Sequence, residues 1–173
     1  MQHLMIDLET YGTRPGAVIR SIGAVIFDDK SIGKEFYTNL TTEDQIAKGC
    51  HVDQGTVDWW NRQSKEAQNQ LLINQQSFEV GMNQFLTFYR SNKPTFVWSQ
   101  GSNFDSVLLD RSFELFGMKI PWRFYNTRDT RTIYHVAGLD IKTIIRDGTY
   151  HNSLDDAKHQ ILCVQESLRR IRG

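Results

Sequence analysis

Three short apolar segments near the N-terminus have the pattern of β-strands. They cover residues 3–9, 19–28 and 34–39 and are rich in apolar, β-branched and aromatic residues, as strands that contribute to a core are. Residues 28–31, with the sequence DDKS, favour a turn. The second and third strands are therefore expected to form a hairpin.

From about residue 41 the apolar positions follow helical spacing. Helices are predicted over residues 56–62, 64–72 and 78–90. The third of these places apolar side chains on one face, namely Phe78, Met82, Phe85, Leu86 and Tyr89.

Strands predicted at residues 94–100 and 122–127 flank a helix at 105–116. Gly101, Ser102 and Asn103 favour a tight exit from the first of these strands. The helix is compatible with one buried stripe formed by Val107, Leu108, Arg111, Leu115 and Phe116.

The C-terminal segment has the clearest helical pattern. Ser153 and Asp156, three residues apart, resemble a capping box and predict the start of this helix. The order of elements, without an internal repeat or linker, predicts a single α/β domain over residues 1–173 around a mixed sheet. The helix repeats apolar residues every three or four positions, at Leu154, Ala157, Ile161, Val164, Leu168 and Ile171.

Composition narrows the functional classes. Lys and Arg total 20, as do Asp and Glu, so the formal net charge is zero, which argues against a general polyanion binder. No apolar run approaches the roughly 18 residues that cross a membrane, and Asp7 is atypical of a signal peptide. Cys50 and Cys163 form no disulfide framework or zinc motif, so a cytoplasmic location is expected.

Asp7 and Glu9 lie two residues apart on the first predicted strand and therefore point to the same face. Such carboxylates repel each other unless a cation lies between them, and oxygen ligands suit Mg²⁺ or Mn²⁺. The alternative is a strand end that carries two solvated acids.

Further candidate residues follow the fourth strand and precede the last helix. Asp105 comes after the strand, where catalytic groups of α/β sheets concentrate. Alternatively, it only lies in the first turn of its own helix, where the helix dipole favours a negative charge. His151 precedes the last helix and is a candidate base or a hydrogen-bonded loop residue. Asp156 lies about one turn inside that helix, and Asp155 should project about 100° away from it.

Three motifs resemble those of the DEDDh family of 3′–5′ exonucleases, namely DLET (7–10), NFDS (103–106) and HNSLDDA (151–157). The resemblance spans most of the chain. It implies a ribonuclease H-like α/β fold with a mixed five-stranded sheet flanked by helices. Three longer segments are similar to a subgroup with phage exonuclease A and a bacterial 3′–5′ exoribonuclease of adenylate-rich tails, namely residues 56–64, 97–105 and 128–132.

The resemblance implies a two-metal hydrolysis of phosphodiester bonds. Asp7, Glu9 and Asp156 would hold one Mg²⁺ or Mn²⁺ ion, and Asp7 would bridge to a second ion held by Asp105. Two ions clamp the attacking and leaving oxygens, while neutral His151 accepts a proton from the attacking water. The expected product is a nucleoside monophosphate from a single-stranded 3′ end.

Substrate contacts are expected at Thr10, Phe104, Trp59 and Arg131. Thr10 would reach the terminal 3′-hydroxyl, the aromatic rings would stack on bases, and Arg131 would bind phosphate. The alternatives are core packing for the aromatic residues and a structural ion pair for Arg131. Of the adjacent Trp59 and Trp60, only one is expected to face the core fully.

Two other functional classes stay open, a non-catalytic nucleic-acid-binding module and a ribonuclease H-like nuclease that cuts internally. The complete set of acids argues against the first, and the His-x4-Asp element argues against the second. The residues do not distinguish DNA from RNA, and a homodimer is expected only from the resemblance. Outside the four acids, basic residues outnumber acidic ones by four, so a metal-loaded protein would be modestly cationic.

Overall fold

The computed structural model describes residues 1–101 and 103–173; Ser102, part of the expected tight exit, lies outside the described residues. A five-stranded sheet has the order β3-β2-β1-β4-β5. β1 pairs antiparallel with β2 and parallel with β4, while β3 and β5 extend the two sides. The strands are β1 (His3–Thr10), β2 (Ile19–Phe27), β3 (Ile32–Asn39), β4 (Phe96–Ser99) and β5 (Thr127–Asp129).

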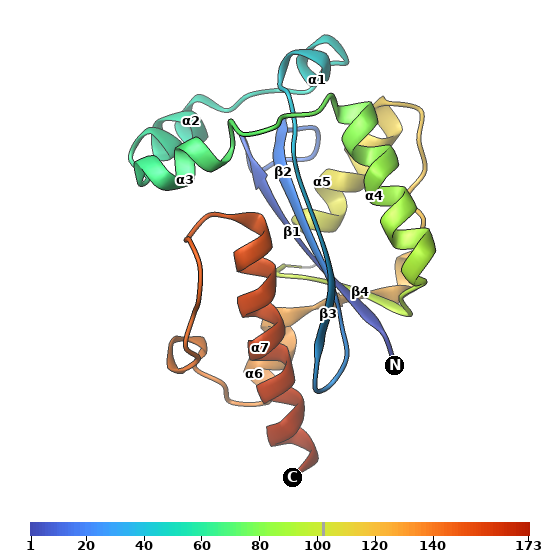
Figure 1. Ribbon diagram of the computed structural model, residues 1–173, viewed down its shortest axis with the longest axis vertical. Coiled ribbons are helices and arrows are strands. Elements are labelled where there is room, and N and C mark those ends of the chain that lie inside the picture. The colour runs from blue at the N-terminus through green and yellow to red at the C-terminus, as the bar shows by residue number, and fades with distance from the viewer. Residues whose placement is uncertain (102) are drawn as a thin grey trace.

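Helices cover both faces of this sheet (Figure 1), which confirms the expected α/β class and is consistent with a ribonuclease H-like fold. α4 and α5 pack on one face, and α6 and α7 pack on the other. No helix in the described ranges is long and apolar enough to cross a membrane. The helices are α1 (Glu43–Ala47), α2 (Gln54–Asn61), α3 (Lys65–Gln70), α4 (Phe78–Asn92), α5 (Asp105–Leu115), α6 (Thr130–Val136) and α7 (Ser153–Arg172), with 3₁₀ turns η1 (Phe124–Asn126) and η2 (Ile141–Thr143).

The side chains of β1 alternate between the two faces. Leu4 and Leu8 join the core beneath α4 and α5, whereas Met5 joins the core beneath α6 and α7. The next two positions on the α7 face are Asp7 and Glu9. The sheet face beneath α7 therefore changes from apolar to acidic within a single strand.

Helix α7 begins directly on β2 at a glycine. Gly23 is the pairing partner of Asp7, and a Cβ at Gly23 would lie 2.2 Å from the carbonyl carbon and oxygen of Ser153. The hydroxyl groups of Ser21 and Ser153 are hydrogen-bonded at 2.9 Å. The helix start can approach the sheet this closely because residue 23 has no side chain.

The expected fifth strand is wrong in its position. β5 is Thr127–Asp129 rather than residues 122–127, because Trp122 packs into the core and η1 follows before the chain pairs with β4. The short helices α1 and α6, with five and seven residues, are too brief to show a clear apolar period.

The expected buried stripe of α5 is also wrong, as is the cap of α7. Val107 and Arg111 are exposed, because the face turned to the sheet starts from Asp105 at the first turn. Asn152 caps α7 instead of Ser153, and its side chain accepts from two backbone N–H groups. The buried residues of α5 are Asp105, Leu108, Leu109, Ser112 and Phe113.

Gly23→Ala is expected to destabilise the protein by about 1–3 kcal/mol, because the added methyl group forces α7 away from β2. Urea unfolding measures the loss. Gly33→Ala on β3 is the control, since its Cβ would lie 3.1 Å from the nearest atom. Equal losses in the two variants would contradict the close approach at Gly23.

Candidate active site

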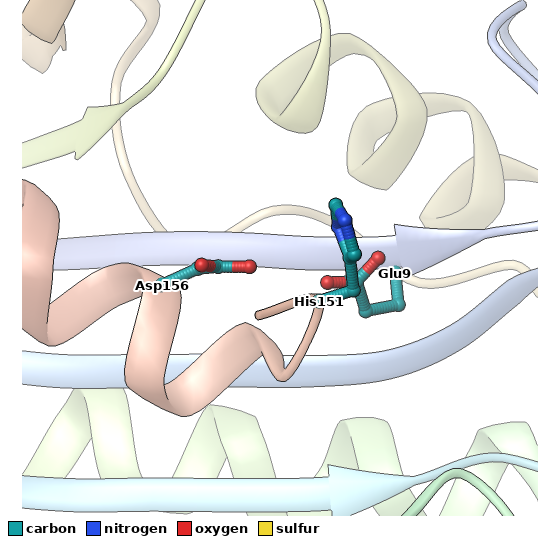
Figure 2. Close-up of side chains that lie close together, drawn as sticks. All are labelled: Glu9, His151 and Asp156. Atoms are coloured by element: carbon teal, nitrogen blue, oxygen red, sulfur yellow. The ribbon is translucent and has the colours of Figure 1, made fainter. Parts of the chain in front are cut away.

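Three side chains from separate elements meet at the N-terminal end of α7. Glu9, His151 and Asp156 each offer one ligand atom, and these atoms lie within 4.8 Å of one another. Figure 2 shows Asp156 on the helix directed toward Glu9 on β1, with His151 on the preceding loop. Glu9 is buried, while His151 and Asp156 are partly exposed, so solvent and ligands can reach the cluster.

Asp7 lies next to this cluster on the same face of β1. Its Oδ1 accepts a 2.7 Å hydrogen bond from Nε2 of Gln160 in α7. Burial raises the pKa of Asp7 well above its ordinary value, and the negative charges of Asp105, Glu9 and Asp156 raise it further. Burial and the charge of Asp156 likewise raise the pKa of Glu9.

Asp105 brings a fourth carboxylate from the first turn of α5. β4 pairs with β1 only as far as Met5, and further along β1 the N–H of Leu8 donates to Asp105 Oδ1 at 3.1 Å. Asp105 is only 2 % exposed. This burial raises its pKa to about 7, although the Leu8 N–H and the charge of Arg131 act in the opposite direction.

The acids around Asp7 and Glu9 thus oppose the ionisation of these two carboxyl groups. Burial is the largest cause of the raised pKa values of Asp7, Glu9 and Asp105, and for Asp7 and Glu9 the neighbouring negative charges add to it. Carboxylate oxygens are the ligands that Mg²⁺ and Mn²⁺ prefer. The residues present therefore fit a divalent cation.

The loop before α7 is fixed by the acid that faces away from the cluster. Asp155 accepts the backbone N–H of Thr149 at 2.8 Å, in line with the expected angle between Asp155 and Asp156. Thr149 also donates its hydroxyl to Glu66 of α3 at 3.0 Å. These contacts tie the loop to two helices.

His151 has a left-handed backbone conformation at φ 63°. Its ring meets Trp59 edge to face, with 4.7 Å between the centroids. Burial lowers the pKa of His151, opposed by the charge of Asp156 and assisted by that of Arg146. The lowered pKa favours the neutral form of the imidazole near neutral pH.

A cavity of about 490 Å³ adjoins Glu9. Three of the expected substrate residues, Thr10, Trp59 and Phe104, line it. Trp59 is 36 % exposed, whereas Trp60 is buried and donates Nε1–H to the carbonyl of Thr10 at 2.9 Å. Only one of the two tryptophans thus faces the core, as predicted.

Arg131 does not line this cavity. A Cβ added at Gly101 would lie 2.8 Å from Nη1 of Arg131, and the charge of Arg131 acts on Asp105. The structure therefore places Arg131 beside Gly101 and near Asp105, outside the cavity that the other expected substrate residues line.

Two polar residues at the site do not emerge from the sequence motifs. Gln160 lies four residues after Asp156, so the helical period alone places both on one face. Arg146 forms an ion pair with Asp156 and lies in a loop whose sequence offers no comparable signal.

The mixed sheet with an acidic cluster on its central strand fits the class of ribonuclease H-like domains. Residues 2–168 match the family described as the 3′-5′ exoribonuclease Rv2179c-like domain, and the chain belongs to this family. No curated protein matches the chain as a relative. The family confirms the expected 3′–5′ exonuclease class, while the narrower DEDDh and phage-like assignments stay predictions.

The raised carboxyl pKa values predict that the metal-free protein loses stability as the pH rises from about 4, the ordinary carboxyl value, through the raised values, with the last part of the loss between about pH 6.5 and about pH 8. A carboxyl with a higher pKa in the folded state favours folding while protonated, and this contribution is lost as the pH rises through the folded-state value. That value is about 7 for Asp105.

Thermal unfolding in EDTA should therefore give a lower Tm at the higher pH, with about 2–4 °C for each kcal/mol lost. Asp7→Asn should reduce the difference, since it removes one ionisable group, and Mn²⁺ should reduce it in the wild type. A Tm independent of pH in EDTA would contradict the raised pKa values.

Proposed function

We propose that this chain removes nucleoside monophosphates from the 3′ end of single-stranded RNA, with two Mg²⁺ or Mn²⁺ ions as cofactors. The observation that carries the proposal is the convergence of four carboxylates and a neutral imidazole beside a cavity lined by an exposed tryptophan. The description of the family as exoribonucleases favours RNA over DNA.

The residues that would hold the ions are Asp7, Glu9, Asp105 and Asp156. When bound, the ions supply positive charge at the phosphate and lower the pKa of a water molecule. The set of oxygen donors and the repulsion that the neighbouring acids exert on Asp7 and Glu9 support this assignment of the ligands.

His151 is suited to accept a proton from the attacking water. Its burial, assisted by Trp59 on one side, keeps the ring neutral before the transfer. The nearby charge of Asp156 raises the pKa of the same ring and so stabilises the imidazolium that the transfer forms.

The cavity beside Glu9 is suited to the terminal nucleoside. Trp59 and Phe104 offer aromatic surfaces for a base. The hydroxyl of Thr10 donates to the carbonyl of Gly12 at 2.7 Å, which leaves its oxygen free to accept from a terminal 3′-hydroxyl. A chain end, rather than a continuous strand, supplies that donor.

His151→Ala is expected to lower kcat on a single-stranded RNA oligonucleotide by about 10²–10⁴-fold, because the proton acceptor is lost. Gel analysis of a 5′-labelled strand with Mn²⁺ measures the rate and shows removal from the 3′ end. The matched control is His135→Ala on the exposed surface of α6, which should keep full activity.

A circular single-stranded RNA provides the test against internal cutting, since it has no 3′ end. The wild-type protein should leave it intact while it degrades the linear form. Cleavage of the circle, or full activity of His151→Ala, would overturn the proposed function. The same assay on a matched DNA strand compares the two kinds of nucleic acid.

Trp59→Ala is expected to raise KM for the RNA strand, since stacking on one base contributes about 1–3 kcal/mol, or about 5–150-fold. Phe124→Ala is the control, because Phe124 is an exposed aromatic residue on η1, outside the cavity. Initial rates over a range of RNA concentrations separate KM from kcat. An unchanged KM in Trp59→Ala would place the base elsewhere.

A further inference from the structure

Arg146 occupies the carboxylate cluster from the loop side. Its Nη2 forms an ion pair with Asp156 Oδ1 and donates to the carbonyl of Thr149 at 3.0 Å. The guanidinium carbon lies 4.1 Å from the centre of the Tyr150 ring. The side chains of Arg146 and Asp156 are only 12 % and 17 % exposed, so water screens the pair little.

This ion pair competes with a bound cation. Asp156 belongs to the cluster that fits a divalent ion together with Glu9 and His151. A guanidinium and a divalent ion on the same carboxylate repel each other. Metal loading at Asp156 therefore weakens this ion pair and favours a shift of Arg146 away from Asp156.

A second cavity provides space for the side chain of Arg146 when it leaves Asp156. It has a volume of about 670 Å³ and reaches the cluster at Asp7 and Asp156, with Arg146, Lys142 and Tyr150 on its wall. It shares no lining residue with the cavity at Trp59. This cavity has cation-binding acids on one side and two basic side chains on another, an arrangement that suits a phosphate group.

The guanidinium also has an unused donor. Within the described residues, the buried Nε of Arg146 has no hydrogen-bond partner. An arginine fork that binds phosphate uses several of its N–H groups at once. The present contacts of Arg146 therefore leave part of its binding capacity free.

We propose that Arg146 exchanges partners, from Asp156 in the metal-free protein to a substrate phosphate in the metal-loaded one. The phosphate belongs to an internucleotide link that enters the cavity lined by Lys142 and Tyr150. This exchange rests on the proposed function, since it requires both a divalent ion and a nucleic acid strand.

The first test is calorimetry with Mn²⁺ alone. Arg146→Gln should bind Mn²⁺ about tenfold more tightly than the wild type, a change equal to about 1.4 kcal/mol, because the competing guanidinium is gone. Lys142→Gln is the matched control, since it removes a positive charge from the same cavity wall without an ion pair to Asp156. It should bind Mn²⁺ nearly as the wild type does.

The second test is KM for single-stranded RNA. Arg146→Gln should raise KM by about tenfold, in the range of charge-assisted hydrogen bonds, even though its metal affinity is higher. If Arg146 were purely structural, its replacement would instead weaken metal binding and substrate binding together. Unchanged or weaker Mn²⁺ binding in Arg146→Gln, or an unchanged KM, would overturn the exchange.

Hydrogen exchange of residues 144–150 tests the same exchange in the wild-type protein, independently of whether the variant folds. Mn²⁺ should speed exchange relative to EDTA, because the Arg146–Asp156 anchor is broken, and adding AMP should slow it again. Slower or unchanged exchange with Mn²⁺ would overturn the proposal for Arg146. Wild-type protein that neither binds Mn²⁺ nor degrades RNA would contradict the proposed function itself.

Discussion

Repulsion among four carboxylates is the constraint on which the arrangement around them depends. β1 supplies two of the acids by the alternation of its side chains, and the other two stand in the first turns of α5 and α7, where the helix dipole favours negative charge. Gly23 lets α7 begin against the sheet, which brings Asp156 to β1. The pKa values of Asp7 and Glu9 are raised first by burial and then by the neighbouring acids, so the charge of the acids is compensated only in part.

The main strands and long helices could be predicted from the sequence because their apolar patterns reflect burial directly. β2 is buried along its whole length, and α7 repeats its apolar face through five turns of helix. The position of β5 could not be predicted, because the apolar residue Trp122 was expected to begin the strand. Trp122 instead fills the core beneath α4, before the strand begins. Short helices such as α6 depend on their contacts with neighbouring elements more than on a local pattern.

At the site, the motif residues could be placed on the correct elements because strand alternation and helical phase fix the direction of a side chain. The contacts that hold these residues in place could not be predicted in the same way. The hydrogen bond from the Leu8 N–H to Asp105 joins residues 97 positions apart. The approach of Arg146 depends on a loop with left-handed backbone at Gly148 and His151. Neither contact follows from a local pattern, since both require the folded chain.

The zero net charge is an average over two unlike regions. The four acids concentrate negative charge at one end of the sheet, while the rest of the chain has an excess of four basic residues. Without cations, this end repels phosphate even though the remaining surface attracts it. Arg146 reduces the local negative charge, but its guanidinium is then engaged with a carboxylate instead of a ligand. Cations at the acids would remove the repulsion and release this guanidinium at the same time, so cofactor and substrate binding would depend on the same few charges.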